Sequence, residues 1–301
     1  MINKKKKEGI AYVLICVLVH GALPILGKYG VSLIHPLYFA ALTNLIAAVS
    51  LVLLMILKGQ SLLLLMDKKQ IGYFIVIALF GTTLSNIFLF YGVRLTSGIN
   101  SAILLQVEPI YAILIGYIIL QERVSFRQVL STFMVMLGTL LVIYQGHFSL
   151  NYGDLLVLCT PLCFQTGHLL SKKLLTNHQV NPIIIATSRT LYGGIFLGLL
   201  SQLFDIPQMS RLSQPHILSL IIFYGVIVYA LSYLTFYESI KRINLSKATA
   251  IISIYPAVSI FLAWFILKEK PGLYQLIGFG FILVGIFYLS HIPSQYREKQ
   301  S

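Results

Sequence analysis

The sequence has too little charge for a soluble fold. Only 10% of its 301 residues are charged and 57% are hydrophobic, whereas a soluble domain carries about 25% Asp, Glu, Lys and Arg. So few ions do not supply a surface that faces water on every side. We therefore expect an all-α integral membrane protein, because helices satisfy their own backbone hydrogen bonds in lipid.

Acidic residues and cysteines are also scarce. The 9 Asp and Glu against 22 Lys and Arg give a net charge of +13, which by itself would suggest a nucleic-acid partner. The basic residues lie in short clusters between long apolar runs, and this distribution excludes that partner. Cys16, Cys159 and Cys163 lie inside apolar runs without the spacing of a zinc site, so we expect inert thiols, no metal and no cofactor.

Catalytic motifs are missing as well. The chain has no His-Glu-x-x-His, no Gly-x-Ser-x-Gly and no phosphate-binding glycine loop. Its longest connections, 58–70 and 204–215, are too short for a soluble active site. A membrane-embedded enzyme is therefore the least favoured class, and ATP is not the expected energy source. A scaffold or regulator on a transporter fold is the other alternative, against which stand the two ions buried in apolar runs, Glu108 and Arg189.

Ten apolar runs are present, most of them close to the roughly 18–20 residues that a membrane helix needs. The first follows Lys4 to Lys7 and imitates a signal peptide, but the repeat described below predicts a retained span. Pro24 and Pro161 are expected to bend the first and sixth helices. The runs are 10–27, 33–57, 71–92, 98–120, 126–144, 153–170, 182–203, 216–238, 245–267 and 273–290.

Lysine and arginine predict the orientation of these runs. With the N-terminus in the cytoplasm, 16 of the 22 Lys and Arg fall on the inner side and 5 on the outer side, and Arg189 lies within a helix. Positive residues favour the cytoplasmic side of a membrane. We therefore expect a multi-pass protein of the bacterial inner membrane with both termini cytoplasmic and its basic clusters attracted to anionic lipid.

Similar segments recur at a nearly constant distance along the chain. Pro109 and Pro256 lie 147 residues apart (256 − 109), as do Gly138 and Gly285. The predicted organisation is a basic tail (1–9), a five-helix repeat (10–144), a second repeat (153–290) and a C-terminal tail (291–301). Because each unit has an odd number of spans, the second must enter the membrane from the opposite side. Ten helices in two inverted repeats around a central cavity are therefore expected, an arrangement typical of transporters.

The duplicated segments resemble the EamA-type members of the drug/metabolite transporter superfamily. The resemblance rests on ordered matches in both repeats, namely 80–85, Phe90-Tyr91, Glu108-Pro109, Gln121-Glu122-Arg123, Gln128 and Gly138, then Tyr233 to Tyr237, Tyr255-Pro256, Lys268-Glu269-Lys270, Gln275 and Gly285. It implies a secondary transporter with ten helices around a cavity, and it favours amino acids or related metabolites as solutes and export as the direction. The chain departs from the family pattern at Thr43, where an Arg is frequent, and at His20-Gly21, where Trp-Gly is frequent.

Glu108 is the strongest site candidate. It lies near the middle of the fourth span, where an unpaired carboxylate costs roughly 2.5–3.5 kcal/mol on insertion scales. Removal from water favours the uncharged carboxyl, which suits proton coupling or cation binding. The alternative is a neutral Glu108 that hydrogen-bonds a neighbouring helix.

Tyr255 and Arg189 are the next candidates. Tyr255 is the repeat mate of Glu108, so a two-fold axis in the membrane plane would bring the two together. Ser101, Glu108 and Ala112 share one helix face, which indicates either a cavity or a close helix contact. Arg189 lies inside the seventh span and binds either an anionic group or a structural partner such as Glu238. For Glu238 we favour a pair with Lys241 or Arg242.

Aromatic and amide side chains complete the expected site. Tyr229, Tyr233 and Tyr237 recur every four residues, and rings of this kind hold flat or cationic solutes. We expect Tyr233 in the interior and Tyr237 in the aromatic belt at the membrane surface. Asn86 is a further candidate, because it recurs with Thr82 and Phe90 every four residues. His20 and Asn44 are also candidates, with a hydrogen-bonded core residue and a small-residue packing face as their alternative roles.

The predicted partners follow from these assignments. We expect a small-molecule solute, protons or another coupling ion, membrane lipid and no nucleic acid, with the chain acting as a monomer or weak homodimer. Glu122 and Glu269 lie in short turns between helices and are expected to be structural caps or surface pairs.

Overall fold

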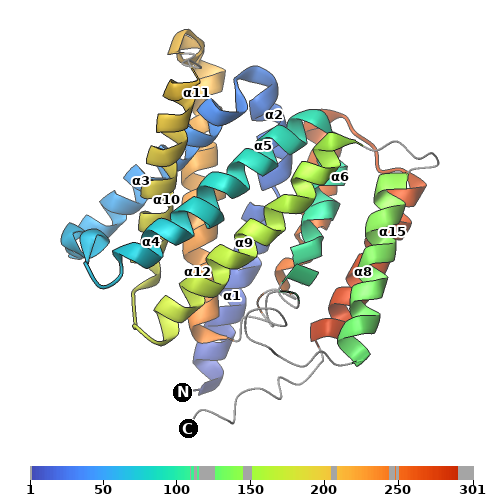
Figure 1. Cartoon of the computed structure of the whole chain (residues 1–301), viewed down its shortest axis with the longest axis horizontal. Coiled ribbons are helices and arrows are strands. Elements are labelled where there is room, and N and C mark those ends of the chain that lie inside the picture. The colour runs from blue at the N-terminus through green and yellow to red at the C-terminus, as the bar shows by residue number, and fades with distance from the viewer. Residues whose placement is uncertain are drawn as a thin grey trace.

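The computed structural model describes residues 2–108, 110, 111, 114, 126–144, 151–204, 209–243, 248 and 251–290. Within these ranges the chain is all-helical, as expected, and has no strand. Figure 1 shows the helices gathered into one bundle. Pro109, Ala112, Glu122 and the predicted C-terminal tail lie outside the described residues.

In the first predicted repeat, the helices over runs 33–57, 71–92 and 126–144 agree with the apolar runs, and the part of run 98–120 beyond Glu108 lies mostly outside the described residues. The run 10–27 divides before Pro24, which occupies the first turn of the second helix. The predicted basic tail is helical from Ile2, because lysine and glutamate favour helix. The elements are α1 (Ile2–His20), α2 (Leu23–Leu33), α3 (Pro36–Leu57), η1 (Leu62–Met66), α4 (Ile71–Ala78), η2 (Leu79–Leu84), α5 (Ser85–Leu95), α6 (Gly98–Leu104), η3 (Leu105–Val107) and α8 (Phe126–Tyr144).

The second half is also helical throughout its described residues. Pro161 lies inside α9 without ending it. Three stretches among the described residues are π-helical, namely η2, η5 and η6. Of these, η2 and η5 stand at matching places in the third and eighth runs, and such wide turns are frequent at functional sites. The elements are α9 (Tyr152–Thr176), α10 (Pro182–Leu203), η4 (Met209–Ser213), α11 (Pro215–Phe223), η5 (Tyr224–Leu231), α12 (Ser232–Arg242), α14 (Tyr255–Leu262), η6 (Ala263–Leu267) and α15 (Leu273–Ser290).

The surface identifies the bundle as a multi-pass membrane protein. Large apolar side chains point outward along many helices, such as Leu57 at 83% and Leu203 at 79% exposure, while Arg189 is fully buried. Five helices in the described ranges are long and apolar enough to cross a membrane, and shorter apolar helices accompany them. The five are Lys5–Leu33, Pro36–Leu57, Ile71–Leu95, Pro182–Leu203 and Pro215–Arg242. The count of ten spans stays a prediction.

Helix pairs pack in a reciprocal pattern. α1 packs on α12 and α5 packs on α9, while α3 packs on α10, α6 on α14, and α8 on α15. Figure 1 shows α8 and α15 standing together at one edge of the bundle. By the repeat offset, α9 is the mate of α1 and α12 is the mate of α5, so the first two contacts correspond to each other.

Glycines show how α8 and α15 run. A Cβ added to Gly138 would lie 2.4 Å from the Gly278 carbonyl oxygen, and one on Gly285 would lie 2.8 Å from the Ser131 carbonyl oxygen. The contact therefore moves backward along α15 as it moves forward along α8, which makes the two helices antiparallel. Gly278 and Ser131 are themselves 147 residues apart (278 − 131), so the two close approaches correspond under the repeat.

Candidate functional site

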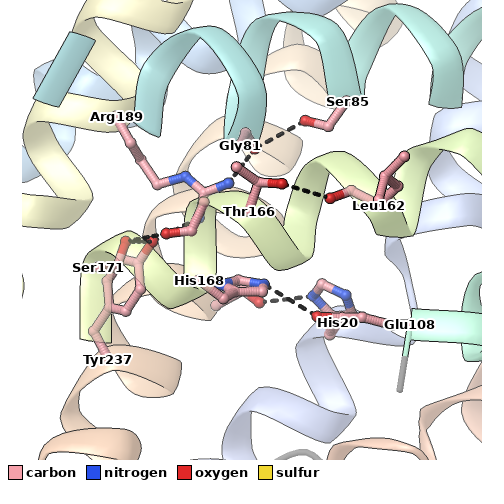
Figure 2. Close-up of polar contacts among 12 residues, drawn as sticks. His20, Gly81, Ser85, Glu108, Leu162, Thr166, His168, Ser171, Arg189 and Tyr237 are labelled. Atoms are coloured by element: carbon pink, nitrogen blue, oxygen red, sulfur yellow. Dashed lines mark hydrogen bonds and ion pairs between the residues drawn. The ribbon is translucent and has the colours of Figure 1, made fainter. Parts of the chain in front are cut away.

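Glu108 stands where α6 and η3 end, among helices from both halves of the chain. Its carboxylate Oε1 lies 3.8 Å from Nε2 of His168 on α9, and the two side chains keep 22% and 12% of their surface exposed. Figure 2 shows Glu108, His168 and His20 facing one another. Its alternative role, a neutral carboxyl that hydrogen-bonds a neighbouring helix, stays open beside this partly exposed side chain.

His168 is a site residue that the sequence argument did not select. Its ring packs 4.7 Å from the Phe236 ring, and its Nδ1 atom is buried with no hydrogen-bond partner in the described part of the chain. The preceding Gly167 lets α9 approach η2, because a Cβ there would lie 2.8 Å from the Gly81 Cα. The signal that could have found His168 is the one used for Glu108, a titratable residue inside an apolar run.

His20 closes the same cluster from the end of α1. Its Nδ1 lies 3.1 Å from the Ser232 hydroxyl, and its ring meets the Tyr255 ring edge-on with centroids 4.9 Å apart. Its Nδ1 is therefore hydrogen-bonded, as the alternative role of a core histidine predicts. Its position beside Tyr255 nonetheless places it at the site.

Tyr255 begins α14 and is buried. Its ring meets the His20 ring edge-on, so Tyr255 points into the protein beside His20. An electrostatic interaction links it to Glu108, and the pairing of these repeat mates at a shared site stays a prediction.

Arg189 on α10 is fully buried and surrounded by neutral acceptors. Its Nε donates to the Thr82 hydroxyl at 3.2 Å, one Nη donates to the Tyr237 hydroxyl at 2.6 Å, and the other donates to the Gly81 carbonyl. Its guanidinium also lies 4.0 Å from the Tyr233 ring centre, a cation–π contact. No carboxylate lies within 4 Å of it among the described residues.

Glu238 pairs with Arg242, the arrangement favoured from the sequence, rather than with Arg189. Arg189 is therefore a cation that ties η2, α10 and α12 together through hydroxyl and carbonyl groups. Its guanidinium offers no surface to a solute in this conformation.

The aromatic stripe is entirely interior. Tyr229 and Tyr233 stack with centroids 5.5 Å apart, and the buried Tyr233 hydroxyl has no partner in the described ranges. The expectation that Tyr237 belongs to a membrane-surface belt is wrong: it is fully buried and hydrogen-bonds Arg189 and, at 3.1 Å, Ser171. A four-residue spacing of rings does not distinguish an inward-facing stripe from a belt.

The two asparagines stand apart from Glu108. The Asn86 amide donates to the Thr82 carbonyl at 2.6 Å and accepts from Tyr229, so it belongs to the network behind Arg189. Asn44 donates to the Ala40 carbonyl at 2.8 Å, and its Oδ1 is buried without a partner in the described part of the chain. No observed contact joins Asn44 to the Glu108 cluster.

The site thus consists of polar and titratable side chains from both halves of the chain. Glu108 and His168 are partly exposed, whereas Arg189 is fully buried. The model of the EamA-like transporter family matches residues 7–144 and again 151–291. The chain belongs to the EamA-like transporter family. Members of this family are membrane transporters, so this chain is a membrane transporter and its family implies a small-molecule solute.

Relatives in bacteria and archaea carry the same general name. "Uncharacterized transporter YyaM" of Bacillus subtilis (strain 168) is 27% identical over 292 residues, which cover 93% of this chain and 94% of the relative. An "uncharacterized transporter" of Archaeoglobus fulgidus is 25% identical over 263 residues, covering 86% and 90%. A crystal structure of another protein matches with a TM-score of 0.68 at 15% identity, over 94% of this chain and 96% of that one, and shows the fold alone.

Proposed function

We propose that this EamA-family protein is a secondary transporter that moves an amino acid or related metabolite across the bacterial inner membrane by alternating access. The observation that carries the proposal is the partly open Glu108 carboxylate, set beside His168 inside a bundle whose neighbouring groups come from both halves of the chain. An ionisable group at this depth of a membrane protein is costly unless it is used.

An inverted repeat of ten spans is part of this proposal. The antiparallel course of α8 and α15, the matching contacts at Gly138 and Gly285, and the reciprocal helix pairs support it. Two lysines add a further correspondence: Lys28 donates to the Val93 carbonyl at 3.0 Å, and Lys172 donates to the Ile240 carbonyl at 2.5 Å. The acceptors are 147 residues apart (240 − 93), and each carbonyl lies near the end of a helix.

Two halves related in this way can rock about a shared site and expose it to each side in turn. Glu108, from the first half, and His168 and Tyr255, from the second, would then form the point that both conformations share. The central cavity, the cytoplasmic termini and the export direction belong to the same proposal, and the last rests on the family resemblance.

Proton coupling through Glu108 is tested by transport measurements on the purified protein in liposomes. With a panel of labelled amino acids and related metabolites, counterflow of at least one solute is expected, with a rate that depends on pH. Glu108→Gln should abolish the pH dependence while expression and melting temperature stay unchanged, because glutamine keeps the shape without the titrating group.

Asp67→Asn is the matched control, since Asp67 accepts from the Lys69 amide in a connection outside the bundle interior. It should behave like the wild type. A Glu108→Gln protein with the same pH profile as the wild type would remove proton coupling from the account. Absence of counterflow for every small organic solute would overturn transport itself.

A further inference from the structure

We propose that Glu108 and His168 form a subsite for an ammonium group, so that the solute presents a primary or secondary amine at this point. The inference rests on the proposed transport function and narrows its substrate class. It makes His168 a specificity-determining residue beside the carboxylate.

The first step is that Glu108 and Arg189 differ in how much of their side chains is exposed. Arg189 is fully buried, and its guanidinium donates hydrogen bonds to Gly81, Thr82 and Tyr237. Glu108 keeps 22% of its side chain exposed and has no cation within hydrogen-bond range among the described residues. The group that a solute meets is therefore a carboxyl, and an ammonium complements its ionised form.

The second step is the geometry of the pair. The 3.8 Å between Glu108 Oε1 and His168 Nε2 exceeds a hydrogen bond. One nitrogen at about 2.9 Å from each atom can nevertheless reach both. An ammonium has several N–H donors and no acceptor, whereas a carboxylate and a neutral imidazole supply acceptors. The unpartnered His168 Nδ1 shows that the ring's hydrogen bonding is incomplete within the described chain.

The third step is the wall of rings around this point. The Phe236 ring centre lies 4.7 Å from that of His168, and the Tyr255 ring, which interacts electrostatically with Glu108, lies 4.9 Å from the His20 ring. Ring faces attract ammonium ions. Phe236 and Tyr255 carry no charge, so the ionised Glu108 would fix the position of the ammonium group.

Charge balance points the same way. The titratable groups that interact with this pair are His20 from α1, Arg189 from α10 and Tyr255 from α14. Tyr237 from α12 also faces the His168 ring. An ammonium that replaces the proton of a neutral Glu108 leaves the net charge of this cluster unchanged. A second anion placed against Glu108 would instead repel the carboxylate.

The test is a binding panel on the purified full chain. Isothermal titration and thermal shift would compare the common amino acids, the amines left by their decarboxylation, and their N-acetyl derivatives. We expect every ligand that binds to carry a free amino group, and N-acetylation of the tightest ligand to weaken binding at least tenfold. Equal binding of an N-acetyl derivative, or binding of acids and neutral solutes alone, would overturn the amine subsite.

Variants separate recognition from folding. His168→Phe should lose at least tenfold in amine affinity, and His168→Gln, which keeps a side-chain acceptor, should restore part of it. Cys163→Ser, on the same helix, is the control and should bind as the wild type does. If His168→Phe binds the amine and its N-acetyl derivative in the wild-type ratio, His168 has no part in recognition. Transport of a solute without an amine would leave the proposed function standing while the subsite falls.

Discussion

At the scale of single residues, the two ions inside the bundle have different surroundings and therefore different expected roles. Arg189 is fully buried and bonded to neutral groups on η2 and α12, while Glu108 keeps an open face beside His168. A buried cation held by hydroxyl and carbonyl groups fixes the positions of the elements that carry them. A partly exposed carboxylate can bind a proton or a solute cation.

Replacement of Arg189 should therefore be felt first as lost stability. Arg189→Met leaves the Gly81 carbonyl and two hydroxyls without their donor, at a cost of roughly 2–4 kcal/mol. Thermal unfolding in detergent should show a clear drop in melting temperature, with transport of anionic and neutral solutes reduced alike. A variant with wild-type stability that selectively loses anionic solutes would instead place Arg189 in contact with the solute.

The sequence singles out those site residues whose charge is unusual inside an apolar run. Glu108 and Arg189 stand out because ions are rare in apolar runs, and Glu269 was expected as a cap and does accept from the Gly98 and Ile99 amides at 3.0 Å. The sequence does not single out His168, because a neutral histidine in a membrane span usually belongs to the core. Tyr237 was misplaced because its partner Arg189 lies 48 residues away in sequence.

At the scale of elements, side chains from separate segments hold the turn between α5 and α6. Lys28 donates to the carbonyls of Val93 and Thr96, where α5 ends, and Glu269 accepts from the first amides of α6. A cation at a helix C-terminus and an anion at an N-terminus both complement the backbone groups left unpaired there.

Removing the Glu269 cap should destabilise this end of the bundle. Glu269→Ala leaves the Gly98 and Ile99 amides without their acceptor, at a cost of about 1–2 kcal/mol, while Glu269→Gln keeps an acceptor and should lose less. Thermal unfolding of both variants beside the wild type checks the order. Equal melting temperatures for all three would show that the cap contributes nothing.

The α8–α15 contact makes a second prediction at this scale. Gly138→Ala places a Cβ 2.4 Å from a backbone oxygen that has no flexible way to move, so the helices must separate at a cost of roughly 1–3 kcal/mol. Gly198→Ala is the control, because nothing lies within 4 Å of its Cβ position. A lower melting temperature for Gly138→Ala, against a neutral or raised one for Gly198→Ala, is expected. The reverse order would contradict the close packing.

Element positions followed from the sequence because apolar runs mark helices well. The runs 126–144, 182–203 and 273–290 coincide with α8, α10 and α15. The sequence does not predict the π-helical stretches η2, η5 and η6, because an apolar run does not distinguish a π turn from an α-helical one. The break at His20 follows from Pro24, whereas Pro161 is absorbed within α9.

At the scale of the whole molecule, the repeat ties fold and function together. The same offset relates the glycines between α8 and α15 and the acceptors of Lys28 and Lys172. The sequence predicts two five-span units because Pro109 and Gly138 recur as Pro256 and Gly285 at one offset, and their opposite threading stays a prediction. Which side of the membrane each loop occupies depends on the charges of the loops, and packing within the chain does not determine it.

The most direct measurement of the central claim is the sidedness of two equivalent helix ends. Lys58 and Phe204 follow α3 and α10, are both exposed, and lie 146 residues apart (204 − 58). In a background without the three native cysteines, Lys58→Cys and Phe204→Cys would be treated in intact cells with a membrane-impermeant maleimide. The account predicts labelling of Phe204→Cys in intact cells and of Lys58→Cys only after permeabilisation. Labelling of both from the same side would contradict opposite threading of the two halves.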